Sequence, residues 1–184
     1  FTTIPSMQSL TSYAVKENDK RIFHDVAWLI STELKAVGID LNFAPVLDID
    51  ESKSSIIGNR AFSKNVKEVI EFSSLYIDGM HEARMKSTGK HFPGHGGVYE
   101  DSHLELVEDQ RSLEDLLHED IKPYSELKDK LDVIMCAHVL FPEVDKKLPS
   151  YSKIWLEDIL RDKLQYKGLI FSDDLSMKGS GDKN

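Results

Sequence analysis

Apolar residues recur along the chain at two spacings, and stretches with the two spacings alternate. Spacings of three and four residues, typical of a helix with one buried face, occur at about 18–37, at about 65–86, from Ser112 onward and at 152–164. Between them lie short apolar runs that favour buried strands, at residues 40–44, 87–91, 132–139 and 168–172. The pattern predicts an α-β-α-β-α-β-α-β order and a parallel sheet covered by helices.

Several residues mark where the predicted helices begin and end. Gly38 is a natural stop for the first helix, Ser112 and Asp115 resemble a capping box, and Ser152 is expected to cap the last helix. Pro123 is suited to opening a further turn. The residues predicted to face inward on the first helix are Ile22, Val26, Leu29, Ile30, Leu34 and Val37.

Polar residues gather where the predicted strands end. They are Asp48, Asp50, His91, His138 and Asp173. The carboxyl ends of parallel strands carry the active site in a (β/α) barrel, and a doubly wound sheet also binds ligands there. Their position therefore predicts a site but does not choose between these two folds.

Charge and composition exclude several classes of protein. The chain has 23 basic and 32 acidic residues, a net charge of −9, and no basic stripe, which argues against nucleic acid and anionic membranes as partners. No apolar run approaches the roughly 20 residues that span a bilayer. Cys136 is the only cysteine, which excludes an internal disulfide and is consistent with a reducing cytosol. Its place within an apolar run predicts packing rather than nucleophilic chemistry.

The densest candidate chemistry is the run Lys90-His91-Phe-Pro-Gly-His95-Gly-Gly97, followed by Asp101-Ser-His103. Its glycines permit tight backbone around a ligand, whereas the competing interpretation is a surface loop with solvated histidines. Asp101 and His103 are two residues apart, so in extended backbone their side chains point the same way. A carboxylate there can hold one imidazole nitrogen and leave the other for proton transfer.

Two further positions each allow more than one interpretation. Asp173 ends the last predicted strand and is suited to being a nucleophile, a metal ligand or a helix cap, and Asp174 or Ser172 can take the capping role instead. Arg60 follows the first predicted strand and can bind ligand hydroxyls or carboxylates, or form a surface ion pair. His138 is expected to line the cleft, with a core position as the alternative.

Six stretches in this order resemble the bacterial β-N-acetylhexosaminidases of glycoside hydrolase family 3. They are Phe1-Thr-Thr-Ile-Pro-Ser-Met-Gln-Ser9, Asn42-Phe-Ala-Pro-Val-Leu-Asp-Ile-Asp50, Ile57-Gly-Asn-Arg-Ala-Phe62, Lys90-His-Phe-Pro-Gly-His-Gly96, Asp101-Ser-His103 and Ile170-Phe-Ser-Asp-Asp-Leu-Ser-Met177. The resemblance covers nearly the whole chain. It implies a TIM-like (β/α)8 barrel of which about four βα units are visible, so residues 1–184 are expected to form part of one catalytic barrel domain with strands lying outside them.

The resemblance also implies a reaction and the residues that perform it. The reaction is a retaining double displacement that releases terminal β-linked N-acetylglucosamine. Asp173 matches the nucleophile, Asp101 and His103 match the general acid/base pair, and Arg60, Lys90 and His91 match residues that bind sugar hydroxyls. The implied substrate is the disaccharide of N-acetylglucosamine and 1,6-anhydro-N-acetylmuramic acid, with or without its peptide, used in cell-wall recycling in the bacterial cytoplasm. No metal or organic cofactor is needed, and the oligomeric state is not indicated.

Two other functions stay open at this point. A metal-dependent hydrolase on the same barrel is one, with His91, His95, His138 and Asp173 as possible zinc ligands. A non-catalytic sugar-binding protein is the other, which would keep Arg60 and Lys90 but would not need Asp173 and His103 together.

Overall fold

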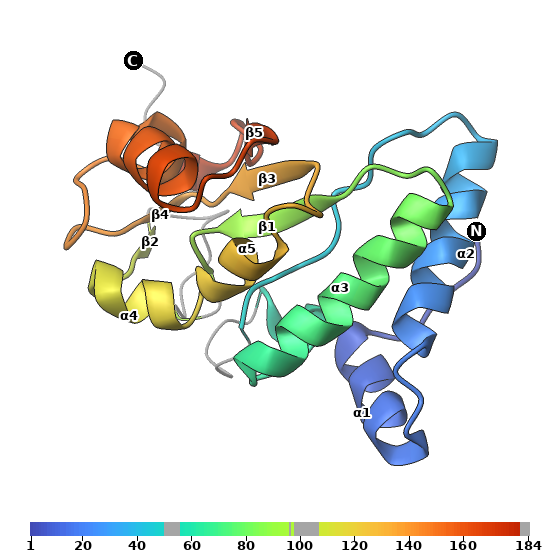
Figure 1. The fold of residues 1–184 in the computed structure, drawn as a ribbon. Helices are drawn as coiled ribbons and strands as arrows, with labels where there is room; N and C mark the ends of the chain where they lie inside the picture. Colours follow the sequence, from blue (N-terminus) through green and yellow to red (C-terminus); the bar gives the residue numbers. More distant parts are fainter. Residues whose placement is uncertain (50–55, 96, 98–106, 181–184) are drawn as a thin grey trace.

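The computed structural model describes residues 1–49, 56–95, 97 and 107–180 (Figure 1). Its α-helices are α1 (Met7–Glu17), α2 (Ile22–Ala36), α3 (Val66–Glu82), α4 (Leu113–His118) and α5 (Lys122–Leu127). Three 3₁₀ turns, η1 (Gly58–Arg60), η2 (Pro149–Tyr151) and η4 (Lys178–Ser180), and the wider π-helix η3 (Ile154–Lys163) complete the helical elements. The strands are β1 (Thr88–Phe92), β2 (Val107–Glu108), β3 (Val133–Cys136), β4 (Val139–Leu140) and β5 (Leu169–Ser172).

The main sheet is parallel, and its strands neighbour one another in chain order. β1 pairs with β3 and β3 pairs with β5, with Thr88 opposite Val133 and Ile134 opposite Ile170. Helix α5 lies in the connection from β1 to β3, and η3 in the connection from β3 to β5. Parallel strands joined by helices in consecutive order are the βα units of a barrel, which confirms the predicted class. β2 and β4 form a separate parallel pair.

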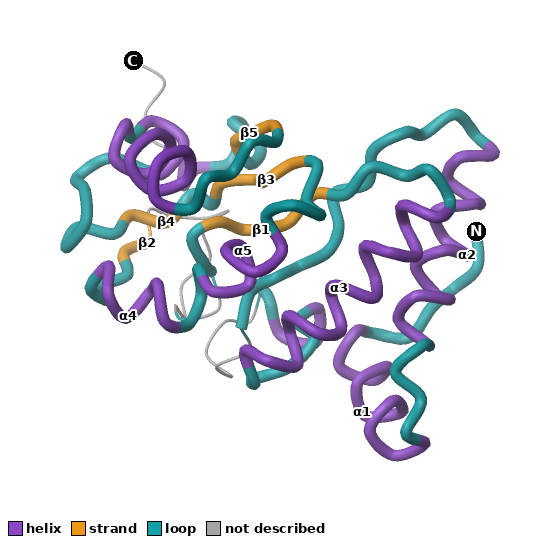
Figure 2. Tube along the Cα trace, in the orientation of Figure 1, coloured by secondary structure: helices purple, strands orange, loops and turns teal. Residues whose placement is uncertain are grey.

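The first predicted strand, residues 40–44, is not a regular strand. This segment runs beside β1 as a loop, joined by two isolated parallel bridges, Leu41 with Lys86 and Val46 with Lys90 (Figure 2). Pro45 has no backbone N–H to donate, so a continuous ladder cannot form through it. The backbone of Leu47 still donates to Lys90 O at 2.7 Å, and the segment therefore delivers its following residues to the end of β1.

Each of the four stretches predicted to be helical contains a helix. The N-terminal helix α1 was not predicted. α1 buries only Leu10 and Ala14, so its apolar signal is sparse, and it begins at a Ser6 cap that accepts from Ser9 N at 3.2 Å. The inward face predicted for 18–37 was correct for Ile22, Val26 and Leu34, which pack against the core, and wrong for Leu29 and Val37, which are exposed. Phe23, Ala27 and Ser31 are the buried residues of α2.

Helices α1, α2 and α3 form one layer beside the sheet, and η3 lies on the opposite side of the molecule (Figure 1). α2 and α3 cross at Gly79, where a Cβ atom would lie 2.1 Å from the carbonyl oxygen of His24. The three helices share an aromatic core in which the Phe23 and Phe72 rings stack at 4.5 Å. A second core lies under the sheet, where the Phe92 ring meets Trp155 edge to face at 5.8 Å.

Both outer edges of the described sheet carry exposed apolar side chains. Leu169 on β5 is 62% exposed, and Phe43 in the segment beside β1 is 52% exposed. A barrel pairs every strand on both sides and leaves no such edge. The sheet of the described residues is therefore an arc of a barrel rather than a closed one.

The capping box predicted at Ser112 is present and gives a measurable contribution to stability. Ser112 Oγ accepts from Asp115 N at 3.2 Å, and the Asp115 carboxylate accepts from Ser112 N at 3.3 Å. Ser112→Ala is expected to lower the free energy of unfolding by about 1 kcal/mol, because the Asp115 N–H loses its acceptor and the Asp115 carboxylate loses the hydroxyl that donates to it. Ser112→Asn, which keeps an accepting oxygen, should lose much less in the same urea titration. Equal losses in the two variants would contradict the capping role.

Candidate active site

Of the polar residues predicted to gather at the strand ends, His91 and Asp173 line one pocket at the carboxyl ends of β1 and β5, and Asp50 lies outside the described residues. A pocket of about 150 Å³ there is lined by Ile56, Ile57, Arg60, Lys90, His91, His95 and Asp173. Four of the six residues proposed from sequence, Arg60, Lys90, His91 and Asp173, are thus brought into one cavity. The other two, Asp101 and His103, lie outside the described residues.

His91 is held by a buried carboxylate that follows the segment beside β1. Asp48 has a fully buried side chain, and its Oδ2 lies 2.7 Å from His91 Nδ1. Its Oδ1 accepts from the backbone N–H of His95 at 2.8 Å and from that of His91 at 3.4 Å. Burial alone opposes a charge on Asp48, but His91 and the His95 backbone outweigh it and hold the pKa of Asp48 below its usual range. Asp48 is therefore an ionised acceptor beneath the histidines.

Asp173 is the carboxylate that faces the pocket. β5 brings it there, and its backbone N–H donates to Cys136 O at 3.0 Å, which fixes it against the end of β3. Its Oδ2 lies 4.0 Å from His91 Nε2, and its Oδ1 accepts from Asp174 N at 2.8 Å. Asp174 points elsewhere, because its carboxylate accepts from Ser176 N at 2.8 Å in the following turn. The turn-capping role therefore belongs to Asp174, and Asp173 is left facing the cavity.

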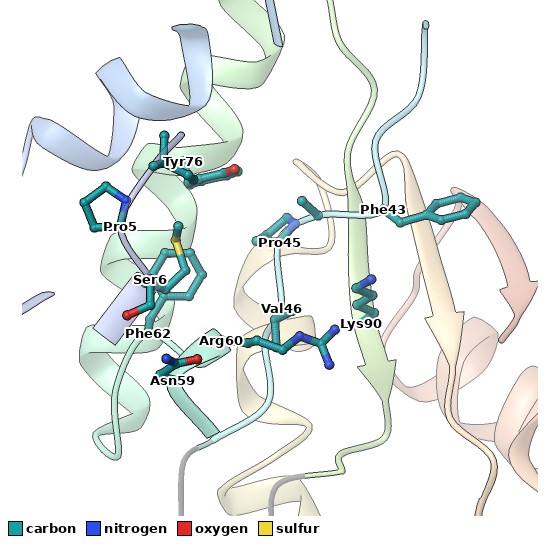
Figure 3. A pocket seen from close by; sticks show the side chains of 13 residues that line it. Pro5, Ser6, Phe43, Pro45, Val46, Asn59, Arg60, Phe62, Tyr76 and Lys90 are labelled. Carbon is teal, nitrogen blue, oxygen red and sulfur yellow. The ribbon is translucent and has the colours of Figure 1, made fainter. Parts of the chain in front are cut away.

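Arg60 and Lys90 bring positive charge to the same cavity. Figure 3 shows the Arg60 guanidinium and the Lys90 side chain extending toward one another from η1 and β1. Burial and the neighbouring Arg60 charge lower the pKa of Lys90, against the opposing influence of Asp173 and Asp48. Within the described part of the chain Arg60 forms no ion pair, and its guanidinium donates only to Ile56 O at 3.2 Å. Its place in the pocket wall is one from which it could bind a ligand.

A larger cavity of about 380 Å³ opens beside this pocket and shares Arg60 and Lys90 with it (Figure 3). Its walls are mainly apolar and include Phe62, Tyr76 and Pro45. Rings and apolar walls combined with a few charged groups are typical of small-molecule sites.

Gly94 and Gly97 of the motif lie in close contact with neighbouring side chains. A Cβ on Gly94 would lie 2.4 Å from Asp120 Oδ1, and one on Gly97 would lie 2.4 Å from an Arg111 nitrogen. Gly94 is not among the glycines with a positive φ. The side chains of Asp120 and Arg111 therefore occupy the space beside this backbone, and any larger residue would displace them.

His138 does not line the cleft, contrary to the expectation. It is fully buried, and its Nε2 donates to Asp174 O at 3.1 Å. The physical reason is that the chain stays in the core after β3 ends at Cys136, since Ala137 and Val139 on either side of His138 are also fully buried. His138 is thus a core histidine that supports the turn carrying Asp173. Cys136 is packed as predicted, and burial raises the pKa of its thiol to about 12.

The set of four zinc ligands considered above is not assembled. Among residues 1–49, 56–95, 97 and 107–180, no group of three or more His, Cys, Asp or Glu side chains is placed to hold a metal ion. In that same part of the chain, no helix is long and apolar enough to cross a membrane.

The sequence did not predict a role for Asp48. In the structure its carboxylate holds both the His91 ring and the His95 backbone. It was noted only as a polar residue at a strand end. The signal that marks it is a lone acid between Leu47 and Ile49, both of which are buried. An acid inside an apolar run must find partners when it folds, and here these are the two histidines.

A parallel sheet of consecutive βα units, with its charged pocket at the carboxyl ends of the strands, defines a (β/α)-barrel of the TIM type. The chain belongs to glycosyl hydrolase family 3. The model of that family's N terminal domain matches residues 1–184.

Named relatives agree with this assignment. A beta-hexosaminidase of Idiomarina loihiensis is 50% identical over 180 residues, covering 98% of this chain and 54% of that protein. One from Pseudomonas aeruginosa is 44% identical over 180 residues, covering 98% and 53%. The chain spans about half the length of the curated relatives it matches.

Solved structures are similar over almost the whole chain. Native NagZ from Neisseria gonorrhoeae has a TM-score of 0.91 at 43% identity, covering 96% of this chain and 53% of that one. The same enzyme has been crystallised with N-trifluoroacetyl-D-glucosamine, again with a TM-score of 0.91. A family 3 β-N-acetylglucosaminidase from Paenibacillus has a TM-score of 0.90 at 34% identity, covering 97% of this chain and 34% of that one.

Proposed function

We propose that the protein acts as a retaining β-N-acetylhexosaminidase that releases terminal β-linked N-acetylglucosamine. The observation that carries the proposal is the single pocket holding Asp173, His91, Arg60 and Lys90 at the carboxyl ends of β1 and β5. Membership of the family, and relatives named beta-hexosaminidase at 44–50% identity, support the reaction class and the sugar.

In this proposal Asp173 is the nucleophile. Its carboxylate attacks the anomeric carbon, the bond to the aglycone breaks, and a glycosyl-enzyme ester forms. Water then attacks the same carbon and releases the sugar, with the configuration retained. Arg60, Lys90 and His91 bind the sugar hydroxyls and hold the ring in line with Asp173.

Asp101 and His103 are proposed as the acid/base pair. His103 gives a proton to the departing oxygen and later takes one from the attacking water. A histidine becomes neutral when it gives up its proton, so it adds no second negative charge beside Asp173. No step requires a metal or an organic cofactor.

The finer assignment is cell-wall recycling in the bacterial cytoplasm. The proposed substrate is the disaccharide of N-acetylglucosamine and 1,6-anhydro-N-acetylmuramic acid, with or without peptide. Residues 1–184 are proposed to contribute to one catalytic barrel domain. The support for this substrate is the family resemblance of the motifs around Arg60, Lys90 and Asp173.

The reaction can be tested with two aryl sugars that differ only at the 2-position. The full-length protein is expected to hydrolyse 4-nitrophenyl β-N-acetylglucosaminide and to act much more slowly on the matching glucoside. Proton NMR of the first product formed should show the β-anomer, because two displacements restore the original configuration. An initial α-anomer, or equal rates on both sugars, would contradict the assignment.

A further inference from the structure

Asp48 is a buried carboxylate that no step of the proposed reaction uses directly. It is absent from the walls of the 150 Å³ pocket, yet it contacts two residues that form those walls, His91 and His95. Burying an ionised carboxylate is costly unless it is fully hydrogen bonded. Its hydrogen bonds to His91 and His95, two of them shorter than 3 Å, offset the cost of burying the charge.

The contact with Asp48 requires a proton on one nitrogen of His91 in particular. An ionised carboxylate can only accept hydrogen bonds, so the 2.7 Å contact requires a proton on His91 Nδ1. The Nε2 atom is then the one that faces Asp173, at 4.0 Å from its Oδ2. That distance exceeds a hydrogen bond, so both groups stay available to a ligand hydroxyl between them.

We propose that Asp48 is a positioning residue for the reaction, which fixes His91 in the tautomer whose Nε2 lone pair faces the pocket and ties the 91–95 turn beneath it. This inference rests on the proposed function for its effect on turnover. The tautomer itself is a property of the folded protein and is measurable without substrate. In the neutral ring, Nε2 accepts a hydrogen bond from a sugar hydroxyl, which orients that hydroxyl toward Asp173.

The substitution Asp48→Asn is expected to move the His91 proton from Nδ1 to Nε2, while the side chain at position 48 keeps almost the same shape. The backbone N–H of His95 requires an oxygen at the Oδ1 position, so the amide nitrogen of the variant must take the Oδ2 position facing His91. That nitrogen donates rather than accepts, and His91 Nδ1 must then lose its proton to receive it. The proton moves to Nε2, and the pocket gains a donor where it had an acceptor.

The experiment combines ¹⁵N NMR of the His91 ring with kinetics in the full-length protein. The native protein is expected to show a protonated Nδ1 and an unprotonated Nε2, and Asp48→Asn is expected to exchange them. Turnover of the aryl N-acetylglucosaminide should fall roughly tenfold to a hundredfold. In a His91→Ala background the same substitution should cost little further, because Asp48 acts through His91.

Asp132 provides a matched control, because it also pairs with a histidine. Its Oδ2 lies 2.8 Å from His81 Nε2, at the opposite end of the sheet, where β3 begins. Asp132→Asn should lower stability but leave kcat and KM unchanged. A native His91 protonated on Nε2 alone, or an equal kinetic loss with and without His91, would overturn the proposal. A native protein inactive on the aryl sugar would reject the proposed function, while the NMR result would still decide the tautomer.

Discussion

Asp173→Asn in the full-length protein is expected to reduce kcat on an aryl N-acetylglucosaminide roughly 10³-fold or more, with little effect on folding. The amide keeps the acceptor that Asp174 N uses at 2.8 Å, so the turn after β5 is preserved. The amide cannot form the glycosyl ester, and the double displacement stops at its first step. Stopped assays at high enzyme concentration would measure the residual rate.

The neighbouring acid gives the matched control. Asp174→Asn changes the same charge one residue away, where the side chain accepts from Ser176 N in the following turn. It should retain most of the activity. A 5-fluoro derivative of N-acetylglucosaminyl fluoride should label the native protein on the peptide that contains Asp173. A label on any other carboxylate would refute the assignment.

Gly79→Ala is expected to destabilise the protein by about 2–3 kcal/mol, even though alanine is the better helix former. Residue 79 lies where α3 crosses α2, and the added Cβ would be 2.1 Å from the carbonyl oxygen of His24 and 2.9 Å from its carbon. Both atoms belong to the backbone, so relief requires the two helices to separate. Urea unfolding would measure the loss.

An exposed position on the same helix gives the comparison. Lys67 lies near the start of α3 and is exposed, so Lys67→Ala should change stability by no more than about 0.5 kcal/mol. A Gly79→Ala protein as stable as the native one would mean that α2 can move away from α3 without loss of packing.

The sequence predicted the parts of the fold whose signals are local. The apolar runs that became β1, β3 and β5 and the amphipathic stretch that became α3 are self-contained patterns. Two elements, α2 and β2, could not be predicted in full because their form depends on neighbouring elements that are distant in the sequence. α2 buries its Phe23–Ala27–Ser31 face because Gly79 lets α3 approach there, which no pattern within 18–37 reveals. β2 has two residues and exists only by pairing with β4.

The residues of the candidate site also fall into those that local sequence signals predict and those that depend on distant partners. Arg60, Lys90, His91 and Asp173 were found because they follow strands and match motifs, and the structure places all four in one pocket. The placement of His138 and the role of Asp48 could not be found, because each depends on a distant partner. Asp48 meets a histidine 43 residues away, and His138 meets a backbone carbonyl 36 residues away.

The consecutive order of β1, β3 and β5 also bears on how the chain assembles during synthesis. Within this sheet, each strand pairs with the strand of the same sheet that precedes it along the chain, so the sheet can grow in the direction in which the ribosome delivers the chain. No strand has to be inserted between two that are already paired. The most recently added strand is always the open edge, and Leu169, 62% exposed on β5, occupies that position among the described residues. β3 can therefore pair with β1, and β5 with β3, in the order in which these strands emerge.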